Sequence, residues 1–143
     1  MSLVMDAAAL TAFLARDFAQ VADDFAIEAV NDTELRLRLR VADHHLRPGG
    51  PVSGPAMFGL ADVAMYLAIL AQIGPVALAV TTNCSIDFMR KPAAGRDLIA
   101  CARVLKLGRQ LAVGDVLLFS EGSAEVVARA GLTYAIPPAL PQS

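Results

Sequence analysis

The chain has 143 residues, the size of one ordinary domain, and its 12 basic and 14 acidic residues give a net charge of -2. No basic block is present, which argues against nucleic acid as a partner. Hydrophobic residues make up 56% of the chain and the mean hydropathy is +0.54, so we expect a homodimer or homotetramer that buries apolar surface between its subunits.

The cysteines and the N-terminus favour a cytoplasmic protein. Cys84 and Cys101 form no metal-type pattern with the two histidines, and we interpret them as small buried hydrophobic residues in a reducing compartment. The first ten residues carry no positive charge and include Asp6, which argues against a signal peptide.

The first 24 residues are expected to hold an N-terminal helix, since apolar residues follow a helical spacing from Met5 to about Gln20. Residues 25–30 are consistent with a strand, followed by an Asn31-Asp32 turn. Leucine and arginine then alternate over residues 35–41, which predicts a strand with one buried and one solvated face. A role of these arginines in binding phosphate is the less favoured interpretation.

A loop rich in Gly and Pro over residues 43–53 precedes a long apolar segment, which predicts a helix over residues 54–73. Ser53 is a suitable N-cap, Pro55 suits the first turn, and Gly74-Pro75 should end the helix. The segment has nearly the length of a membrane span. Because Asp62 lies inside it and no basic flank follows, we expect a buried central helix instead.

The C-terminal half has the pattern of strands. We expect one long, bent strand over residues 77–90, a hairpin of residues 98–107 and 111–119 around Gly108-Arg109, and a last strand over residues 125–136 after a turn at 121–123. Residues 138–143 should form a loose tail. The fold class predicted for this single domain, residues 1–143, is therefore α+β, with a mainly antiparallel sheet wrapped around one buried helix.

Asp62 is the only residue charged at neutral pH between Arg47 and Asp87. An isolated buried carboxylate is costly, so it must be paired, hydrogen-bonded or protonated. Position alone leaves two interpretations open: a functional carboxylate, or one that bonds a Thr or Tyr for packing.

The helix start at Gly54 offers free N–H groups and the positive end of the helix dipole. Such groups can hold a carbonyl oxygen as it gains negative charge, although ordinary capping explains the glycine equally well. Gly54 and Asp62 are eight residues apart, about 12 Å along one helix. If both act on one carbonyl, they should therefore come from two chains related by a two-fold axis.

Several segments together resemble the PaaI-like family of hotdog-fold acyl-CoA thioesterases, over roughly residues 25–137. The first segment is similar to the family's His-Gly-Gly…Leu-Ala-Asp signature and reads Val52-Ser53-Gly54-Pro55-Ala56-Met57-Phe58-Gly59-Leu60-Ala61-Asp62. The second resembles the family's next strand and reads Val80-Thr81-Thr82-Asn83-Cys84-Ser85-Ile86-Asp87-Phe88-Met89-Arg90. The last two are the turn Leu107-Gly108-Arg109 and the late strand Val126-Val127-Ala128-Arg129-Ala130.

The resemblance implies a thioester hydrolase with a hotdog fold and a site shared between the subunits of a dimer. By position, Asp62 matches the acid that attacks the thioester or activates water. Gly54 matches the glycine whose N–H polarises the carbonyl, and Thr81 matches a Ser/Thr that helps to place the water or the carboxylate. No metal or redox cofactor is implied, and coenzyme A enters only as part of the substrate.

Three positions depart from the family pattern. Ser53 stands where the family has His, Pro55 replaces the second Gly, and Arg47 replaces a frequent Asn, so substrate orientation by Ser53 and Arg47 would differ. His44 and His45 could compensate, although an exposed loop is the simpler interpretation. The alternatives are a non-hydrolytic acyl-CoA-binding hotdog protein and, less favoured, an enoyl-CoA hydratase or dehydratase, which would need a His near the start of the central helix.

Two further groups are candidates for substrate binding. An acyl pocket could be lined by apolar residues of the central helix: Met57, Phe58, Met65 and Tyr66. The CoA phosphates could meet cations near strand ends or turns: Arg90, Lys91, Lys106 and Arg109. Ordinary core packing and solvated charge explain the same residues.

Overall fold

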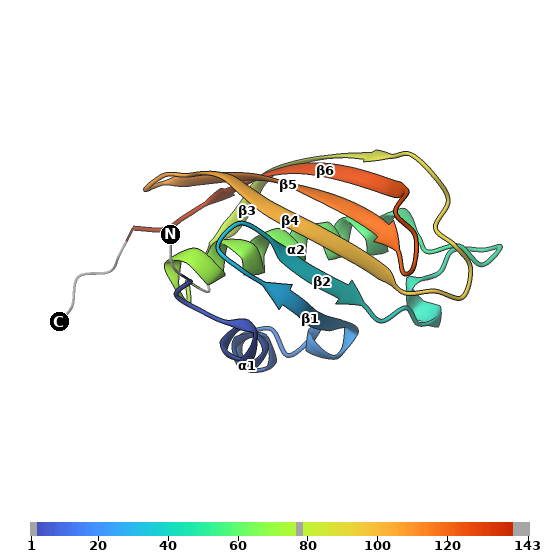
Figure 1. Cartoon of the computed structure of the whole chain (residues 1–143), viewed down its shortest axis with the longest axis horizontal. Coiled ribbons are helices and arrows are strands. Elements are labelled where there is room, and N and C mark those ends of the chain that lie inside the picture. The colour runs from blue at the N-terminus through green and yellow to red at the C-terminus, as the bar shows by residue number, and fades with distance from the viewer. Residues whose placement is uncertain (1–2, 77–78, 139–143) are drawn as a thin grey trace.

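The computed structural model describes residues 3–76 and 79–138 of the chain (Figure 1). The elements in chain order are α1 (Ala7–Asp17), the short 3-10 helix η1 (Ala22–Asp24), β1 (Phe25–Val30), β2 (Leu35–Leu39), the 3-10 helix η2 (Asp43–His45), α2 (Gly54–Ile73), β3 (Val80–Phe88), β4 (Leu98–Leu107), β5 (Leu111–Ser120) and β6 (Val126–Ala135).

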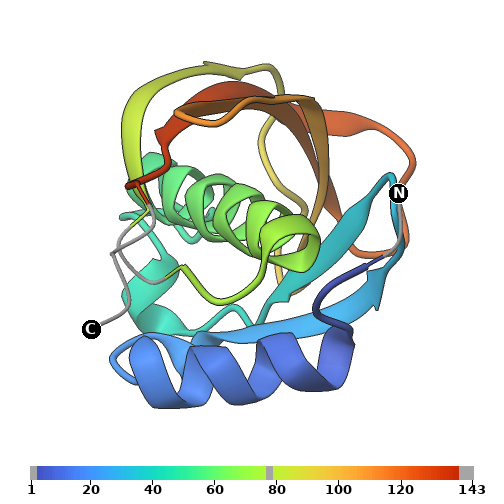
Figure 2. The same ribbon diagram turned by 90° about the vertical axis from the view of Figure 1, so that its left-hand side faces the viewer.

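The α2 helix spans the residues predicted from the sequence. Its N-cap is Ser53, whose hydroxyl accepts from the Ala56 N–H at 3.2 Å, and it ends at Gly74, whose φ of 95° is accessible mainly to glycine. By length and hydropathy α2 could cross a membrane, but it lies within the curve of the sheet, with most of its side chains buried (Figure 2). The predicted central helix is confirmed.

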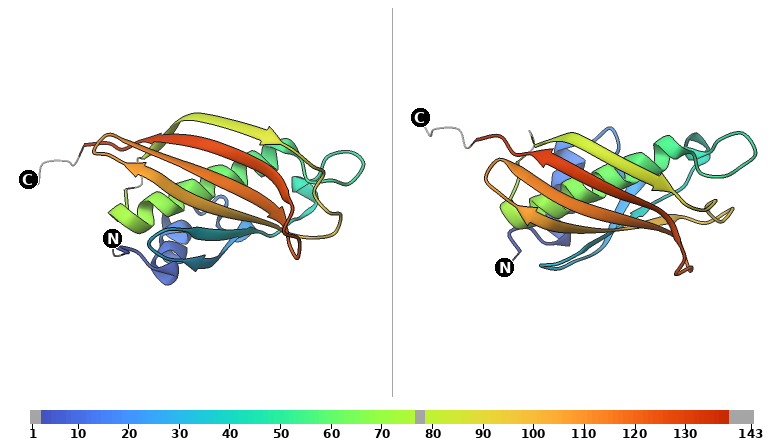
Figure 3. Two further views of the ribbon diagram at one scale, coloured as in Figure 1. Left: turned by 45° about the horizontal axis from the view of Figure 1, so that its top comes forward. Right: turned by 90° about the horizontal axis from the view of Figure 1, so that it is seen from above.

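Six strands form one antiparallel sheet in the order β1-β2-β4-β5-β6-β3 (Figure 3). The predicted hairpin turn at residues 108–109 joins β4 to β5. The strand predicted over residues 77–90 is shorter, because β3 begins at Val80 and ends at Phe88; residues 77–78 lie outside the described residues. β3 is an edge strand and Val80 and Phe88 are more than half exposed.

The α1 helix is shorter than the predicted 5–20 and packs beside β1 at the open end of the curved sheet (Figure 2). Asp6 caps it by accepting from the Ala9 N–H at 2.9 Å. Leu10, Phe13 and Leu14 are its buried face, in keeping with the helical spacing read from the sequence. The predicted loose tail is described only at residue 138.

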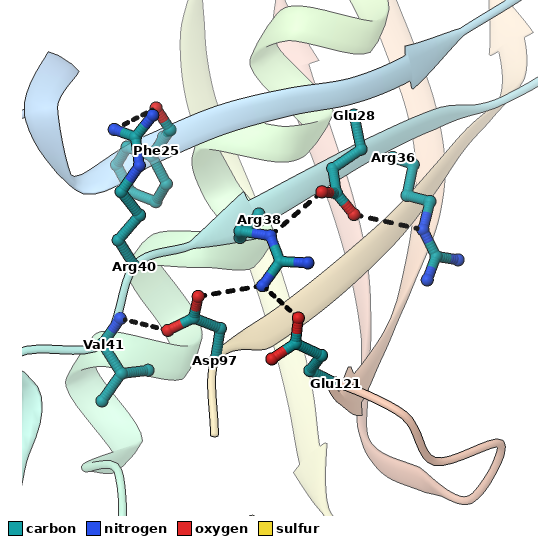
Figure 4. A network of polar contacts seen from close by, with 8 residues as sticks. All are labelled: Phe25, Glu28, Arg36, Arg38, Arg40, Val41, Asp97 and Glu121. Carbon is teal, nitrogen blue, oxygen red and sulfur yellow. Dashed lines mark hydrogen bonds and ion pairs between the residues drawn. The ribbon is translucent and has the colours of Figure 1, made fainter. Parts of the chain in front are cut away.

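The arginines of β2 lie on the outer face of the sheet, as predicted, but they are not simply solvated (Figure 4). The Arg38 guanidinium contacts the carboxylates of Glu28, Asp97 and Glu121 at 2.7–3.0 Å. These partners come from β1, from the residue before β4 and from the residue after β5. The network therefore ties together four segments of the sheet.

Candidate active site

Asp62 lies midway along α2, half-buried, with two hydroxyl groups on one carboxylate oxygen. Thr81 Oγ1 and Tyr134 Oη each donate to Asp62 Oδ1 at 2.6 Å. The negative charge of Asp62, isolated within an apolar helix, is therefore compensated by hydrogen bonds rather than by a cation. Both donors belong to strands that cover the helix, β3 and β6.

A β-bulge puts Thr81 in this position. In the β3–β6 register Thr81 pairs with Tyr134 and Asn83 pairs with Thr133, so Thr82 is the extra residue. Side chains normally alternate along a strand, but the bulge lets Thr81 and Cys84 both lie on the partly buried side of β3. Thr81 and Tyr134 are thus cross-strand neighbours that reach the same oxygen.

Tyr134 was not among the residues singled out from the sequence. A signal was present: residues 128, 130, 132 and 134 alternate onto the buried face of β6, so the strand pattern directs Tyr134 toward the central helix. A buried tyrosine hydroxyl needs a partner, and Asp62 was the charge in need of a donor. What the sequence could not supply was the register between β6 and α2.

Burial, and then the nearby Asp62 carboxylate, raise the pKa of the Tyr134 hydroxyl, so this group stays protonated and remains a donor. The same two causes raise the pKa of the Cys84 thiol, which is therefore a poor nucleophile. Cys84 and Cys101 are free thiols, but both are half-buried rather than buried as predicted, and Cys101 Sγ accepts from the Arg36 guanidinium at 3.7 Å. Asp62 is the group beside β3 suited to nucleophilic or basic chemistry.

The start of α2 presents one free N–H. Pro55 has no N–H, the Ala56 N–H is capped by Ser53 Oγ, and the Met57 N–H donates to the Ser53 carbonyl at 3.1 Å. Among the described residues no acceptor is found for the Gly54 N–H. The helix dipole makes this position favourable for a developing negative charge.

Gly54, which carries the free N–H, lines a pocket of about 460 Å³. Five of the predicted site residues line it, from the loop before α2, from α2 and from the segment after β3: Arg47, Gly54, Met57, Arg90 and Lys91. The remaining lining residues are mostly apolar: Pro51, Val52, Phe88, Met89 and Pro92. Asp62 and Thr81 do not line this pocket, so one chain carries two separate parts of the predicted site.

The other predicted substrate contacts lie elsewhere. Met65 and Tyr66 are core residues: Met65 packs under Gly114, and the Tyr66 ring stacks on Tyr134 with centroids 6.0 Å apart. Phe58 is partly exposed on α2, and Arg109 is exposed in the β4–β5 turn. Neither Phe58 nor Arg109 lines the pocket.

Asp24, His44 and His45 form a cluster, with one ligand atom of each residue within 4.8 Å of the others. The Ala42 N–H donates to His45 Nδ1 at 2.9 Å, so the ring proton lies on Nε2, the atom 3.4 Å from Asp24. A metal on Nε2 would require that proton to move to Nδ1, against the Ala42 N–H. His44 is exposed, as expected of a loop residue, whereas His45 is buried, contrary to that expectation. The cluster therefore stabilises the loop rather than forming a metal centre, and neither histidine lines the pocket.

An antiparallel sheet wrapped around one long helix, with a carboxylate held at mid-helix, defines a hotdog-fold protein of the thioesterase type. The chain belongs to the thioesterase superfamily, whose family model matches residues 49–127. The resemblance read from the sequence is therefore confirmed.

Solved structures of other proteins have the same fold. A thioesterase candidate from Silicibacter sp. TM1040 is 58% identical over 96% of both chains, with a TM-score of 0.90. The Escherichia coli PaaI protein from the phenylacetic acid degradation operon is 26% identical over 88% of both chains, with a TM-score of 0.75. A protein described as a hypothetical thioesterase, solved with coenzyme A, from Streptococcus pneumoniae is 22% identical over 91% of this chain and 98% of that chain, with a TM-score of 0.75. No curated protein sequence matches the chain.

Proposed function

We propose that this protein hydrolyses acyl-CoA-type thioesters, with Asp62 as the reacting carboxylate and the Gly54 N–H as the oxyanion donor. The observation that carries the proposal is the state of Asp62: one oxygen holds two hydroxyl donors, while Oδ2 has no donor among the described residues. No buried side-chain oxygen of those residues lacks a partner, so Oδ2 retains contact with solvent.

The chemistry needs two groups on opposite sides of a thioester carbonyl. Asp62 either attacks the carbonyl carbon, giving an anhydride that water then hydrolyses, or takes a proton from water that attacks the same carbon. In both routes the carbonyl oxygen becomes an oxyanion, which the Gly54 N–H and the helix dipole stabilise. The C–S bond then breaks, the CoA thiolate leaves and takes a proton, and the acid is released.

The two groups would meet in a dimer paired along β3. Thr81, at the start of β3, holds Asp62, whereas the Phe88 ring, at its end, lies beside Gly54. If two β3 edges pair antiparallel about a two-fold axis, the start of one strand lies opposite the end of the other. Asp62 of one chain then approaches Gly54 of the second, and the exposed Val80 and Phe88 become covered.

The pocket suits a thioester with an anionic carrier. Arg47 and Lys91 have no carboxylate partner among the described residues, so their charges are available to phosphate groups. Arg90 is already paired with Glu125 at 2.9 Å and is the weaker candidate. Because a neighbour of the same fold was solved with coenzyme A, CoA thioesters are the first substrates to test.

A thiol-release assay across short, long and aromatic acyl-CoAs tests the function. Asp62→Asn should lower kcat/KM on the best substrate by about 10²- to 10⁴-fold. Asp115→Asn, an equal change at an exposed position of β5, should leave it unchanged. Wild-type activity in Asp62→Asn, or no thiol release from any member of the panel, would contradict the proposal.

A non-hydrolytic acyl-CoA-binding protein is the second candidate. Ser53, which stands at the family's His position, has its hydroxyl engaged as the helix cap, so the polar group that the family supplies there is missing. Acyl-CoA binding measured by calorimetry, without release of free thiol, would favour this candidate.

A further inference from the structure

Tyr134 makes the most buried polar contact with the candidate carboxylate. Its side chain is buried against α2, and its hydroxyl oxygen lies 2.6 Å from Asp62 Oδ1 and 2.9 Å from the Asp62 backbone carbonyl oxygen. The ring is held by the stacked Tyr66, which in turn contacts Phe13 and Phe18. The hydroxyl therefore has little freedom to turn away from Asp62.

The donors divide the two carboxylate oxygens into different roles. Each hydroxyl has one proton to give, and both Thr81 and Tyr134 lie 2.6 Å from Oδ1. An ionised carboxylate accepts at both oxygens, yet Oδ2 receives no donor among the residues that the structure describes and remains in contact with solvent. Oδ1 is thus the anchored oxygen and Oδ2 the one open to a reactant.

We propose that Tyr134 is a positioning residue: with Thr81 it anchors Oδ1 of Asp62 and so reserves Oδ2 as the oxygen that reacts. This inference rests on the proposed function for its kinetic consequences. Tyr134 contacts Asp62 and does not line the pocket, so it acts through the orientation of the carboxylate. It also gives Thr81 a definite role, since the Thr81 hydroxyl is used on Asp62 rather than on water.

Fixing the carboxylate has a kinetic consequence. A side-chain rotation that exchanges Oδ1 and Oδ2 is suppressed, which keeps the reacting oxygen in one place. Removing a donor should therefore slow the chemical step and leave substrate affinity largely intact.

Tyr134→Phe tests this, because it keeps the stacked ring and removes only the hydroxyl. On the best acyl-CoA, kcat should fall about 10- to 100-fold with little change in KM. Thr81→Val should act in the same direction. Thr82→Val is the matched control: it removes a hydroxyl from the bulge that bonds only the Thr133 carbonyl, and it should keep wild-type kinetics.

A measurement without catalysis separates this inference from the proposed function. Aspartate carboxyl ¹³C NMR on labelled protein gives one signal that Asp62→Asn removes. In Tyr134→Phe the chemical shift of that signal should change, because the carboxylate loses a donor, and in Thr82→Val it should not change. A changed signal in a protein that hydrolyses no acyl-CoA would contradict the proposed function and support the anchoring role of Tyr134. An unchanged signal, or unchanged kcat in an active enzyme, would overturn that role.

Discussion

A shared site makes a prediction about mixed dimers that a site within one chain does not. Gly54 and Asp62 are separated by about 12 Å along α2, whereas both must lie within about 3 Å of atoms of one reacting carbonyl group. If both groups act on one carbonyl, as proposed, one chain supplies only half of each site. Asp62→Asn disables the carboxylate. Gly54→Val adds a branched side chain at the start of α2, where a Cβ alone would lie 3.4 Å from the Phe88 ring, and so crowds the oxyanion position.

A heterodimer of an Asp62→Asn chain and a Gly54→Val chain has one site with both defects and one with neither. Each heterodimer should therefore show about half of the wild-type thiol-release rate, although either homodimer is nearly inactive. The heterodimer is obtained by co-expression with two different affinity tags and sequential purification. Circular dichroism melts of both homodimers establish that each variant chain folds.

The reciprocal arrangement is the control. A chain carrying both substitutions, paired with a wild-type chain, has one defect in each of its two sites and should be inactive. If each site lay within one chain, the outcomes would be reversed: the first heterodimer inactive and the second about half active. That reversal, or failure to recover any doubly tagged protein, would refute the shared-site reasoning.

Three further outcomes follow from the packing and the charges. Gly114→Ala should lower the free energy of unfolding in urea by about 1–3 kcal/mol, because a Cβ there would lie 2.5 Å from the Arg103 carbonyl oxygen and 2.3 Å from Met65. Arg38→Met should lower it by about 1–3 kcal/mol, because three carboxylates lose their common partner. Burial acts to raise the pKa of Asp97, but hydrogen bonds from the Val41 N–H and from Arg38 hold this pKa below its ordinary value. The stabilisation that Asp97 contributes is therefore present above about pH 4 and lost on further acidification. Asp97→Asn should make the free energy of unfolding, measured in urea at a series of pH values, fall less at acid pH.

Local sequence signals predicted most of the fold. The Ser53 cap, the proline of the first turn and Gly74 bounded α2 correctly, because helix ends depend on neighbouring residues. The Leu–Arg alternation predicted β2 for the same reason, since side chains along a strand alternate between two faces. Asp62 was found because a charge within an apolar helix requires compensation.

The parts that sequence reasoning missed depend on contacts between distant segments. Tyr134 meets Asp62 across 72 residues, and the Thr81 contact with the same carboxylate depends on a bulge at Thr82 that no local pattern predicts. Arg38 was correctly placed on the outer face of its strand, but its partners Asp97 and Glu121 become neighbours only once the sheet has formed. Pairing of this kind follows from the order of the strands in the sheet, which the alternation within any single strand does not specify.

The position of α2 in the chain has a consequence for biosynthesis. The helix is long and apolar enough to cross a membrane, yet four of the six strands that enclose it, β3 to β6, follow it in the sequence. During translation α2 therefore leaves the ribosome before strands β3 to β6 have been synthesised, and its apolar surface stays exposed until the last of these strands emerges. The interval between synthesis of α2 and of β6 is when the nascent chain is most prone to aggregate or to engage a chaperone.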